Sequence, residues 1–349
     1  MRAGFYRVDI TPKEEGRIFT NEYGKNVMLV PHDVGDNMYA RILVVDDGEN
    51  KQVVISTDLC TSNEEDVFCY DTRLGVRKLT SQWPGGTKDY ISELTGVSVQ
   101  NIYLMATHNH LAPTCCQSIN IVKELATGVK RAIENLEEVQ LSYTETDYNL
   151  VKNRRPWSNT LNTELPHDTK VRILLFYNKS GKMIGAIINY ACHGTILRYG
   201  PYPHKISGEF IGIGMSKIEE KMGNGFVSMF MQGASGDNGP VIDKDYSFVV
   251  HCGRRLANIV LDALEKNTLD FSNNKEILTV DKVVSVKKAI YPATNENANI
   301  RLNIFVFIRC YLLFLVVIGI IPRVDARGYC TFWFIGVINW GRICEAVYG

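Results

Sequence analysis

Short apolar runs that alternate with helix-length amphipathic segments constrain the fold of this 349-residue chain more than any other feature. The runs have strand length and are rich in Val, Ile, Leu, Phe and Tyr, as buried strands are. They cover residues 40–45, 52–56, 101–105, 171–177, 183–190 and 226–231. The spacing of apolar residues predicts helices over 61–80, 121–136, 211–222 and 248–266. This alternation predicts an α/β fold, a layered mixed β-sheet flanked by helices in a single large domain.

The overall composition excludes several classes of protein. Lys and Arg together number 38, as do Asp and Glu, whereas a nucleic-acid scaffold usually carries a basic excess. The 45% apolar content is too high for disorder over most of the length. Nine cysteines include no C-x-x-C pair, so neither a zinc knuckle nor a disulfide framework is indicated. The N-terminal residues show no apolar signal region, so we expect reduced thiols and a cytoplasmic location. The sequence does not indicate an oligomeric state.

Residues 291–349 differ in composition from 1–290, and we expect them to form an atypical apolar, aromatic-rich tail. All lysines precede residue 300, and the stretch 303–321 carries a single charge, Arg309. A transmembrane helix needs about 20 mostly apolar residues. The tail therefore has three interpretations: a buried core segment, a C-terminal membrane anchor through 303–321, or sequence translated out of its original reading frame. We rank the third first and the anchor second.

Two histidines follow directly after the apolar run that ends at Met105. His108 and His110 would point to opposite faces of an extended strand, but a bend at the strand end can bring them together. The ends of strands are where α/β proteins bind ligands. One histidine could then coordinate a metal while the other hydrogen-bonds the reacting group. The alternative is a pair of ordinary loop histidines.

His193 also follows an apolar run of strand length, so it repeats the setting of His108. Two strand-end histidines could converge on one ion at the same edge of a sheet. They would supply half of a zinc site, because a catalytic zinc has three protein ligands and a water. The alternative is a single buried histidine bonded to a carbonyl. Cys192 would face away from His193 on a strand, and we do not expect it to be a ligand.

Two further segments have the composition of a ligand-binding loop. Residues 232–240 follow an apolar run and are rich in glycine, which lets backbone approach a ligand closely, although an ordinary turn is the alternative. Their spacing fits neither a phosphate-binding Walker loop nor a nucleophile elbow. Arg154, in the sequence Asn153-Arg154-Arg155-Pro156, could supply a cation to an anionic substrate or transition state. A solvated basic turn is the alternative there.

Taken in order, these segments resemble the N-terminal hydrolase domain of the neutral/alkaline non-lysosomal ceramidase family. The opening residues 3–12 look like the family's A-G-x-x-x-x-D-I-T-P, and Thr107 to His110 sits where the family has T-H-T-H. The other segments that carry the resemblance are Asp36-Asn37-Met38-Tyr39-Ala40-Arg41, Asn153-Arg154-Arg155-Pro156, Asn189 to His193, Ile206-Ser207-Gly208-Glu209 and Gln232 to Pro240.

The resemblance implies a zinc-dependent hydrolase of C–N amide bonds. Its substrate would be an N-acyl sphingoid lipid or another small-molecule or lipid amide, and no nucleic acid is implied. His108 and His193 would be Zn²⁺ ligands, His110 would lie beside the metal for hydrogen bonding or proton transfer, and Arg154 would line the site. Zinc polarises an amide carbonyl and lowers the pKa of bound water toward ~7.

The chain also departs from the family pattern. Gly239 stands where ceramidases have a serine before the proline, which disfavours ceramide itself and favours the broader, uncharacterised branch of the family. The family's other zinc ligands, a Glu and a Tyr, come from farther along the chain, where this sequence becomes the atypical tail. The alternative is therefore a catalytically inactive relative with an incomplete metal site, acting as a binding module or representing a non-functional gene product.

Overall fold

The computed structural model describes residues 1–12, 18–22, 25–29, 33–60, 67–71, 75–79, 85–112, 119–153, 166–197, 205–240, 245–267, 277–287, 297–309, 312–321 and 336–339. Its largest sheet has eight strands in the order β15-β13-β12-β10-β1-β5-β6-β9. In chain order these are β1 (Arg2–Asp9), β5 (Tyr39–Asp46), β6 (Lys51–Thr57), β9 (Ile102–Ala106), β10 (Glu137–Asp147), β12 (Lys170–Asn178), β13 (Met183–Tyr190) and β15 (Val227–Gln232).

The eight strands form two halves of four. Strands β1 and β10 pair through only two residue pairs, Arg2 with Glu138 and Ala3 with Glu137, whereas β1 and β5 pair along all of β1. The two halves face each other, because Ser56 on β6 donates a hydrogen bond to the carbonyl of Phe230 on β15 at 2.6 Å. Each half is mixed: β6 runs parallel to β9 in one half, and β13 runs parallel to β15 in the other.

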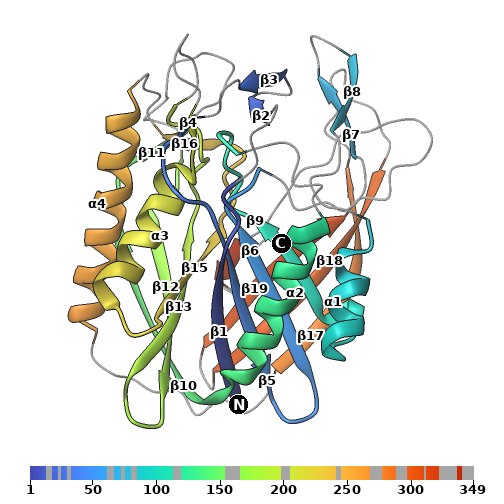
Figure 1. Ribbon diagram of the computed structural model, residues 1–349, viewed down its shortest axis with the longest axis vertical. Coiled ribbons are helices and arrows are strands. Elements are labelled where there is room, and N and C mark those ends of the chain that lie inside the picture. The colour runs from blue at the N-terminus through green and yellow to red at the C-terminus, as the bar shows by residue number, and fades with distance from the viewer. Residues whose placement is uncertain are drawn as a thin grey trace.

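Helices cover the outer face of each half, so the molecule has four layers (Figure 1). The half with β9 is covered by α1 (Thr87–Thr95) and α2 (Ile119–Glu134). The half with β15 is covered by α3 (Glu209–Met222) and α4 (Tyr246–Glu265). A single turn of 3₁₀ helix, η1 (Val99–Asn101), precedes β9.

The alternation of side chains along the strands produces three separate cores. On β5, Ile42 and Val44 pack toward α2, whereas Leu43 and Val45 point between the two halves. The inner core includes an edge-to-face pair of Phe5 and Phe176, whose ring centroids lie 5.1 Å apart. Because both faces of these strands are buried, their sequences are continuous apolar runs.

Short strands complete the fold. They are β2 (Ile18–Glu22), β3 (Lys25–Leu29), β4 (Asp33–Val34), β7 (Val67–Asp71), β8 (Gly75–Leu79), β11 (Val151–Asn153), β14 (Lys205–Ile206) and β16 (Asn238–Pro240). Strand β11 pairs with β16, and β14 pairs with β4.

The predicted α/β fold class, its layers and its mixed sheet are confirmed. All six apolar runs are strands, and three of the four predicted helices are present. The helix predicted over 61–80 is wrong, because β7 and β8 form an antiparallel hairpin there. The prediction relied on the helical spacing of apolar residues, although Asp71 at the end of β7 and Gly75 at the start of β8 are of types common beside turns.

Four antiparallel strands occupy the C-terminal region: β17 (Ile277–Lys287), β18 (Asn297–Arg309), β19 (Leu312–Ile321) and β20 (Gly336–Asn339). The apolar stretch 303–321 is therefore divided between two paired strands. Among the described residues, no helix combines the length and apolarity needed to cross a membrane. The domain boundary predicted after residue 290 falls between the paired strands β17 and β18, and that division stays a prediction.

Candidate metal centre

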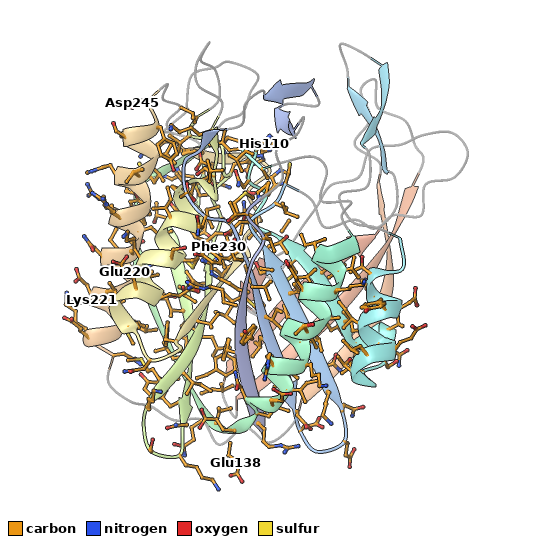
Figure 2. All side chains as sticks on the ribbon, viewed as in Figure 1. His110, Glu138, Glu220, Lys221, Phe230 and Asp245 are labelled. Atoms are coloured by element: carbon orange, nitrogen blue, oxygen red, sulfur yellow. The ribbon has the colours of Figure 1, made fainter. Side chains whose placement is uncertain are left out.

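The loop after β9 carries the first two candidate histidines. Backbone pairing continues past the strand end, because Thr107 donates to the carbonyl of Thr57 at 2.9 Å and Asn109 donates to that of Leu59 at 3.1 Å. Figure 2 shows His110 in the upper part of the view and Glu138, at the start of β10, at the bottom. The loop is therefore held against the segment that follows β6, the parallel neighbour of β9.

A left-handed turn at His108 brings the two histidines together. Its φ of 60° is unusual for a residue other than glycine and breaks the extended alternation. As a result the Nε2 atoms of His108 and His110 face each other at 3.4 Å, and both rings are half-buried. The expectation that a bend at the strand end could unite these side chains is met in the geometry.

His193 reaches the same place from the other half of the sheet. It lies three residues beyond β13, is 6% exposed, and its backbone N–H donates to the carbonyl of Asn238 at 3.3 Å. Its ring centroid lies 4.5 Å from that of His108 and 5.2 Å from that of His110. We call His108, His110 and His193 the histidine cluster.

Direct backbone contact joins the two histidine loops. Asn109 and Gly194 form a parallel β-bridge, and His110 donates its N–H to the carbonyl of Gly194 at 3.2 Å. A Cβ added at Gly194 would lie 3.2 Å from the Cα of Asn109, so only glycine allows this approach without a shift. The bridge fixes the distance between His193 and the other two rings.

The rings of His108 and His193 are each oriented by a backbone carbonyl. In both cases the carbonyl belongs to the loop that follows the neighbouring parallel strand. Nδ1 of His108 donates to the carbonyl of Cys60, after β6, at 2.8 Å. Nδ1 of His193 donates to the carbonyl of Ser235, after β15, at 3.1 Å. A carbonyl oxygen can only accept, so each Nδ1 carries the hydrogen and each neutral ring keeps its lone pair on Nε2.

These donors fit a zinc ion. Histidines that bind metal usually donate their other ring N–H to a carbonyl or carboxylate, as His108 and His193 do. Tetrahedral zinc with Zn–N bonds of about 2.0–2.1 Å separates two ligand nitrogens by about 3.3–3.4 Å. The measured Nε2–Nε2 distance of 3.4 Å between His108 and His110 has that value. His110 is thus placed to act either as a ligand or as a neighbour that exchanges a proton.

A cysteine that we had not selected from the sequence also belongs to this group. The ligand atoms of Cys60, His108 and His110 all lie within 4.8 Å of one another. Cys60 is 4% exposed, and burial raises the pKa of its thiol to about 12. Without a neighbouring cation the side chain is therefore a neutral thiol at pH 7.

Asn109 lies between His108 and His110 in the sequence, and its side chain fixes their loop through hydrogen bonds. Its side-chain amide donates to the carbonyls of Asp58, at 3.3 Å, and Ser207, and its Oδ1 accepts from the backbone N–H of Leu111 at 2.8 Å. Asn109 is fully buried. These bonds connect the loop to the ends of β6 and β14, so Asn109 positions both histidines.

The glycine-rich segment 232–240 supports His193 with the carbonyls of Ser235 and Asn238. A Cβ at Gly233 would lie within 2.7 Å of the backbone of Ala191, so this close approach requires glycine. Strand β16 in this segment pairs with β11, and Asn153 donates to the carboxylate of Asp237 at 3.3 Å. Arg154, predicted to line the site, lies outside the described residues.

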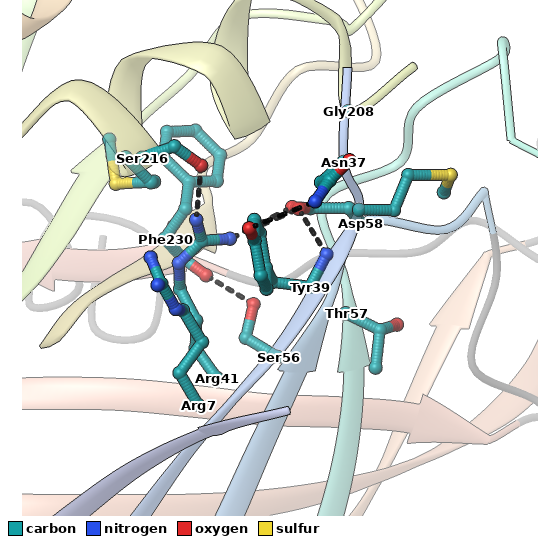
Figure 3. Close-up of polar contacts among 12 residues, drawn as sticks. Arg7, Asn37, Tyr39, Arg41, Ser56, Thr57, Asp58, Gly208, Ser216 and Phe230 are labelled. Atoms are coloured by element: carbon teal, nitrogen blue, oxygen red, sulfur yellow. Dashed lines mark hydrogen bonds and ion pairs between the residues drawn. The ribbon is translucent and has the colours of Figure 1, made fainter. Parts of the chain in front are cut away.

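A second polar group adjoins the loop of His108 and His110, because the carbonyl of Asp58 accepts from Asn109. Figure 3 shows its central residue, Arg41, with Asp58 and Ser216. Arg41 on β5 donates to Asp58 at 3.0 Å, to Glu219 on α3 at 2.8 Å and to Ser216 at 3.1 Å. Arg7 also donates to Glu219, at 2.5 Å. We call Arg7, Arg41, Asp58, Ser216 and Glu219 the arginine cluster.

The arginine cluster is ionic. Burial opposes the charge on Arg41, but Glu219 and Asp58 raise the pKa of its guanidinium above the ordinary value. Burial raises the pKa of Asp58 to about 6, and Arg41 opposes that rise. At neutral pH the pair is therefore charged and hydrogen-bonded, as buried charges must be.

Glu209 fixes the chain just beyond His193. Its Oε1 accepts from the backbone N–H groups of Ile196 at 2.6 Å and Leu197 at 3.2 Å, and its Oε2 accepts from Phe210 at 2.8 Å. Its φ is 58°, a conformation held in place by these three bonds. Burial raises the pKa of Glu209 to about 7, although the three N–H groups favour the ionised form.

Comparison with known proteins shows which solved structures share this fold. No protein-family model matches the sequence, and no curated protein matches it either. Solved structures that match include neutral ceramidase from Pseudomonas aeruginosa, with a TM-score of 0.64 and 18% identity, and a ceramidase complexed with C2, with 0.63 and 19%. The chain has a ceramidase-like fold. Each alignment covers 86% of this chain but 50% and 49% of the ceramidase chains, so this chain spans about half their length.

Proposed function

We propose that this protein is a zinc-dependent hydrolase that cleaves C–N amide bonds. The observation that carries the proposal is the meeting of three imidazoles at 4.5–5.2 Å between ring centroids, two of them with Nδ1 bonded to a carbonyl. The ceramidase-like fold supports it, because the proteins that share this fold are named for the hydrolysis of a lipid amide. The substrate class proposed is an N-acyl lipid amide or another small amide.

His108 and His193 would hold the ion through Nε2. Their rings are fixed before any metal arrives, by the carbonyls of Cys60 and Ser235 and by the bridge between Asn109 and Gly194. Ligands fixed in this way need little rearrangement on binding. When bound, zinc supplies a positive charge that polarises an amide carbonyl and acidifies water.

His110 is the proposed proton carrier. Amide hydrolysis adds water across the C–N bond, so one proton must pass from the water to the departing amine nitrogen. The ring of His110 is half-buried and its Nε2 faces the cluster, so it can accept that proton and release it to the amine. Arg154 is proposed by resemblance to line the same site. The cytoplasmic location and a membrane association through 303–321 stay predictions.

Metal content tests the proposal first. Protein purified without chelators should contain about one zinc per chain by elemental analysis, and both His108→Ala and His193→Ala should lose it. His251→Ala is the matched control, because His251 is an exposed histidine on α4. Hydrolysis of fluorogenic amides with acyl chains of increasing length would then define the substrate, and His110→Ala should lower kcat while zinc is retained.

A catalytically inactive relative is the second candidate. The observation that favours it is Gly239, which stands where the resemblance leads us to expect a serine. Well-folded wild-type protein that contains no zinc, or zinc-loaded protein that hydrolyses none of the amides, would favour this candidate over the hydrolase.

A further inference from the structure

Cys60 lies beside the histidine loop through contacts of its own backbone. It follows β6 by three residues, and its carbonyl accepts the hydrogen of Nδ1 of His108. The preceding residue, Leu59, accepts the N–H of Asn109. The hydrogen bonds that Leu59 and Cys60 accept from Asn109 and His108 therefore hold Cys60 beside the histidine loop.

The side chain of Cys60 meets the same histidines. Its Sγ and the ligand nitrogens of His108 and His110 lie within 4.8 Å of one another. A tetrahedral ion with bonds of about 2.3 Å to sulfur and about 2.0–2.1 Å to nitrogen separates S and N by about 3.5 Å. Binding of an ion by both residue types therefore requires a side-chain rotation that closes what remains of that difference.

We propose that Cys60 is a metal ligand, so that the ion is bound by a thiolate together with imidazoles. The inference rests on the metal site of the proposed function and changes its chemistry. On coordination the thiol proton is released to solvent and a sulfur–metal bond forms. A thiolate with imidazoles selects Zn²⁺ or Co²⁺ over Mg²⁺ and Ca²⁺, which prefer oxygen ligands.

A thiolate ligand also explains how a site could be completed within the described chain. Added to His108 and His193, Cys60 would bring the protein ligands to three, and three ligands with one open position is the pattern of catalytic zinc sites. The negative sulfur lowers the net charge of the centre from +2 to +1. The ion would therefore polarise a carbonyl less strongly than one bound by neutral imidazoles alone.

Cobalt substitution tests the inference without any need for activity. The full chain, freed of metal and titrated with Co²⁺, should show a thiolate-to-cobalt charge-transfer band in the near ultraviolet as well as the visible bands of cobalt. Cys60→Ser should abolish the near-ultraviolet band and weaken Co²⁺ binding by at least about tenfold, as second-shell changes alone cost 10–100-fold.

Cys192→Ser is the matched control, since Cys192 is a buried cysteine adjacent to His193 and should leave the band unchanged. Cys60→Ala serves as a second variant, and circular dichroism of each metal-free protein verifies the fold. Visible cobalt bands that depend on His108 but come without the near-ultraviolet band would overturn the role of Cys60 and leave the histidine site standing. Absence of all cobalt bands would overturn both.

Discussion

The arginine cluster and the histidine cluster adjoin each other, yet they are built on opposite principles. In the arginine cluster the guanidinium of Arg41 is neutralised by Asp58 and Glu219 and fully engaged by hydrogen bonds. In the histidine cluster the outer nitrogen of two rings is held by a carbonyl, and the inner Nε2 atoms of His108 and His110 are directed at each other. In the arginine cluster the buried charges therefore satisfy one another. The histidine cluster instead presents nitrogen ligand atoms to an additional partner such as a metal ion.

Loss of Arg41 should have the largest effect and should be confined to stability. Arg41→Ala leaves the buried carboxylate of Asp58 without its cation and Glu219 with Arg7 alone, which costs about 3–5 kcal/mol of unfolding free energy. Arg7→Ala is the control, because Arg7 is partly exposed and such pairs contribute about 0–1 kcal/mol. Urea unfolding measures both. If the comparison holds, Arg41→Ala protein that remains folded still binds zinc.

A neutral replacement sharpens this test. Arg41→Met combined with Asp58→Asn and Glu219→Gln removes all three buried charges, so it should recover part of the stability lost in Arg41→Ala. Equal losses in the two variants would show that packing around Arg41, rather than charge, stabilises the cluster.

Glu209 should make stability depend on pH. Its pKa is raised from 4.5 to about 7, so the folded state holds a proton that the unfolded state releases at lower pH. The contribution of Glu209 is therefore fully present below about pH 4.5 and lost as the pH rises through about 7, a change of about 3 kcal/mol. Unfolding free energies from pH 4.5 to 8 should show a flatter profile for Glu209→Gln. Parallel profiles would contradict the shift.

Zinc should stabilise the protein through the histidine cluster and not through the arginine cluster. At a free zinc concentration of 100 times Kd, unfolding free energy should rise by about 2.7 kcal/mol. The rise should vanish in His108→Ala and persist in Arg7→Ala. A comparable rise in His108→Ala would place the zinc elsewhere in the chain.

Asn109 connects the two clusters, because its side chain bonds to the carbonyl of Asp58 while its neighbours are the loop histidines. Asn109→Ala should cost about 2 kcal/mol, since it leaves buried carbonyls without their donor. It should also weaken zinc binding by about 10–100-fold. Asn109→Asp keeps the acceptor for Leu111 but lacks the amide donor, so it separates the two contributions. Unchanged zinc affinity in both variants would exclude a positioning role.

The sequence predicted the layers and the long strands because strands buried on both faces read as continuous apolar runs. It also indicated where His108 and His193 would lie, since both follow such runs. It did not predict the arginine cluster, because Arg41 lies inside an apolar strand and its partners Asp58 and Glu219 come from distant segments. The pairing of β5 with β6 sets Asp58 beside Arg41, and the approach of the two halves adds Glu219 from α3.

Cys60 was missed for a related reason. Its position three residues past β6 was visible in the sequence, and the parallel pairing of β6 with β9 is what sets it beside His108. Strand ends can be located from one sequence, but the order of strands in a sheet cannot. The left-handed backbone conformation of His108 could not be predicted either, since histidine has no strong preference for a positive φ.

The bridge between Asn109 and Gly194 has a kinetic consequence. It joins loops from two four-stranded halves whose strand pairing, between β1 and β10, is limited to two residue pairs, so it can close only after both halves have assembled. Contacts between such distant parts of a chain form late, because the entropy of closing long loops must be overcome first. An ion bound there would accordingly slow unfolding far more than it would accelerate folding.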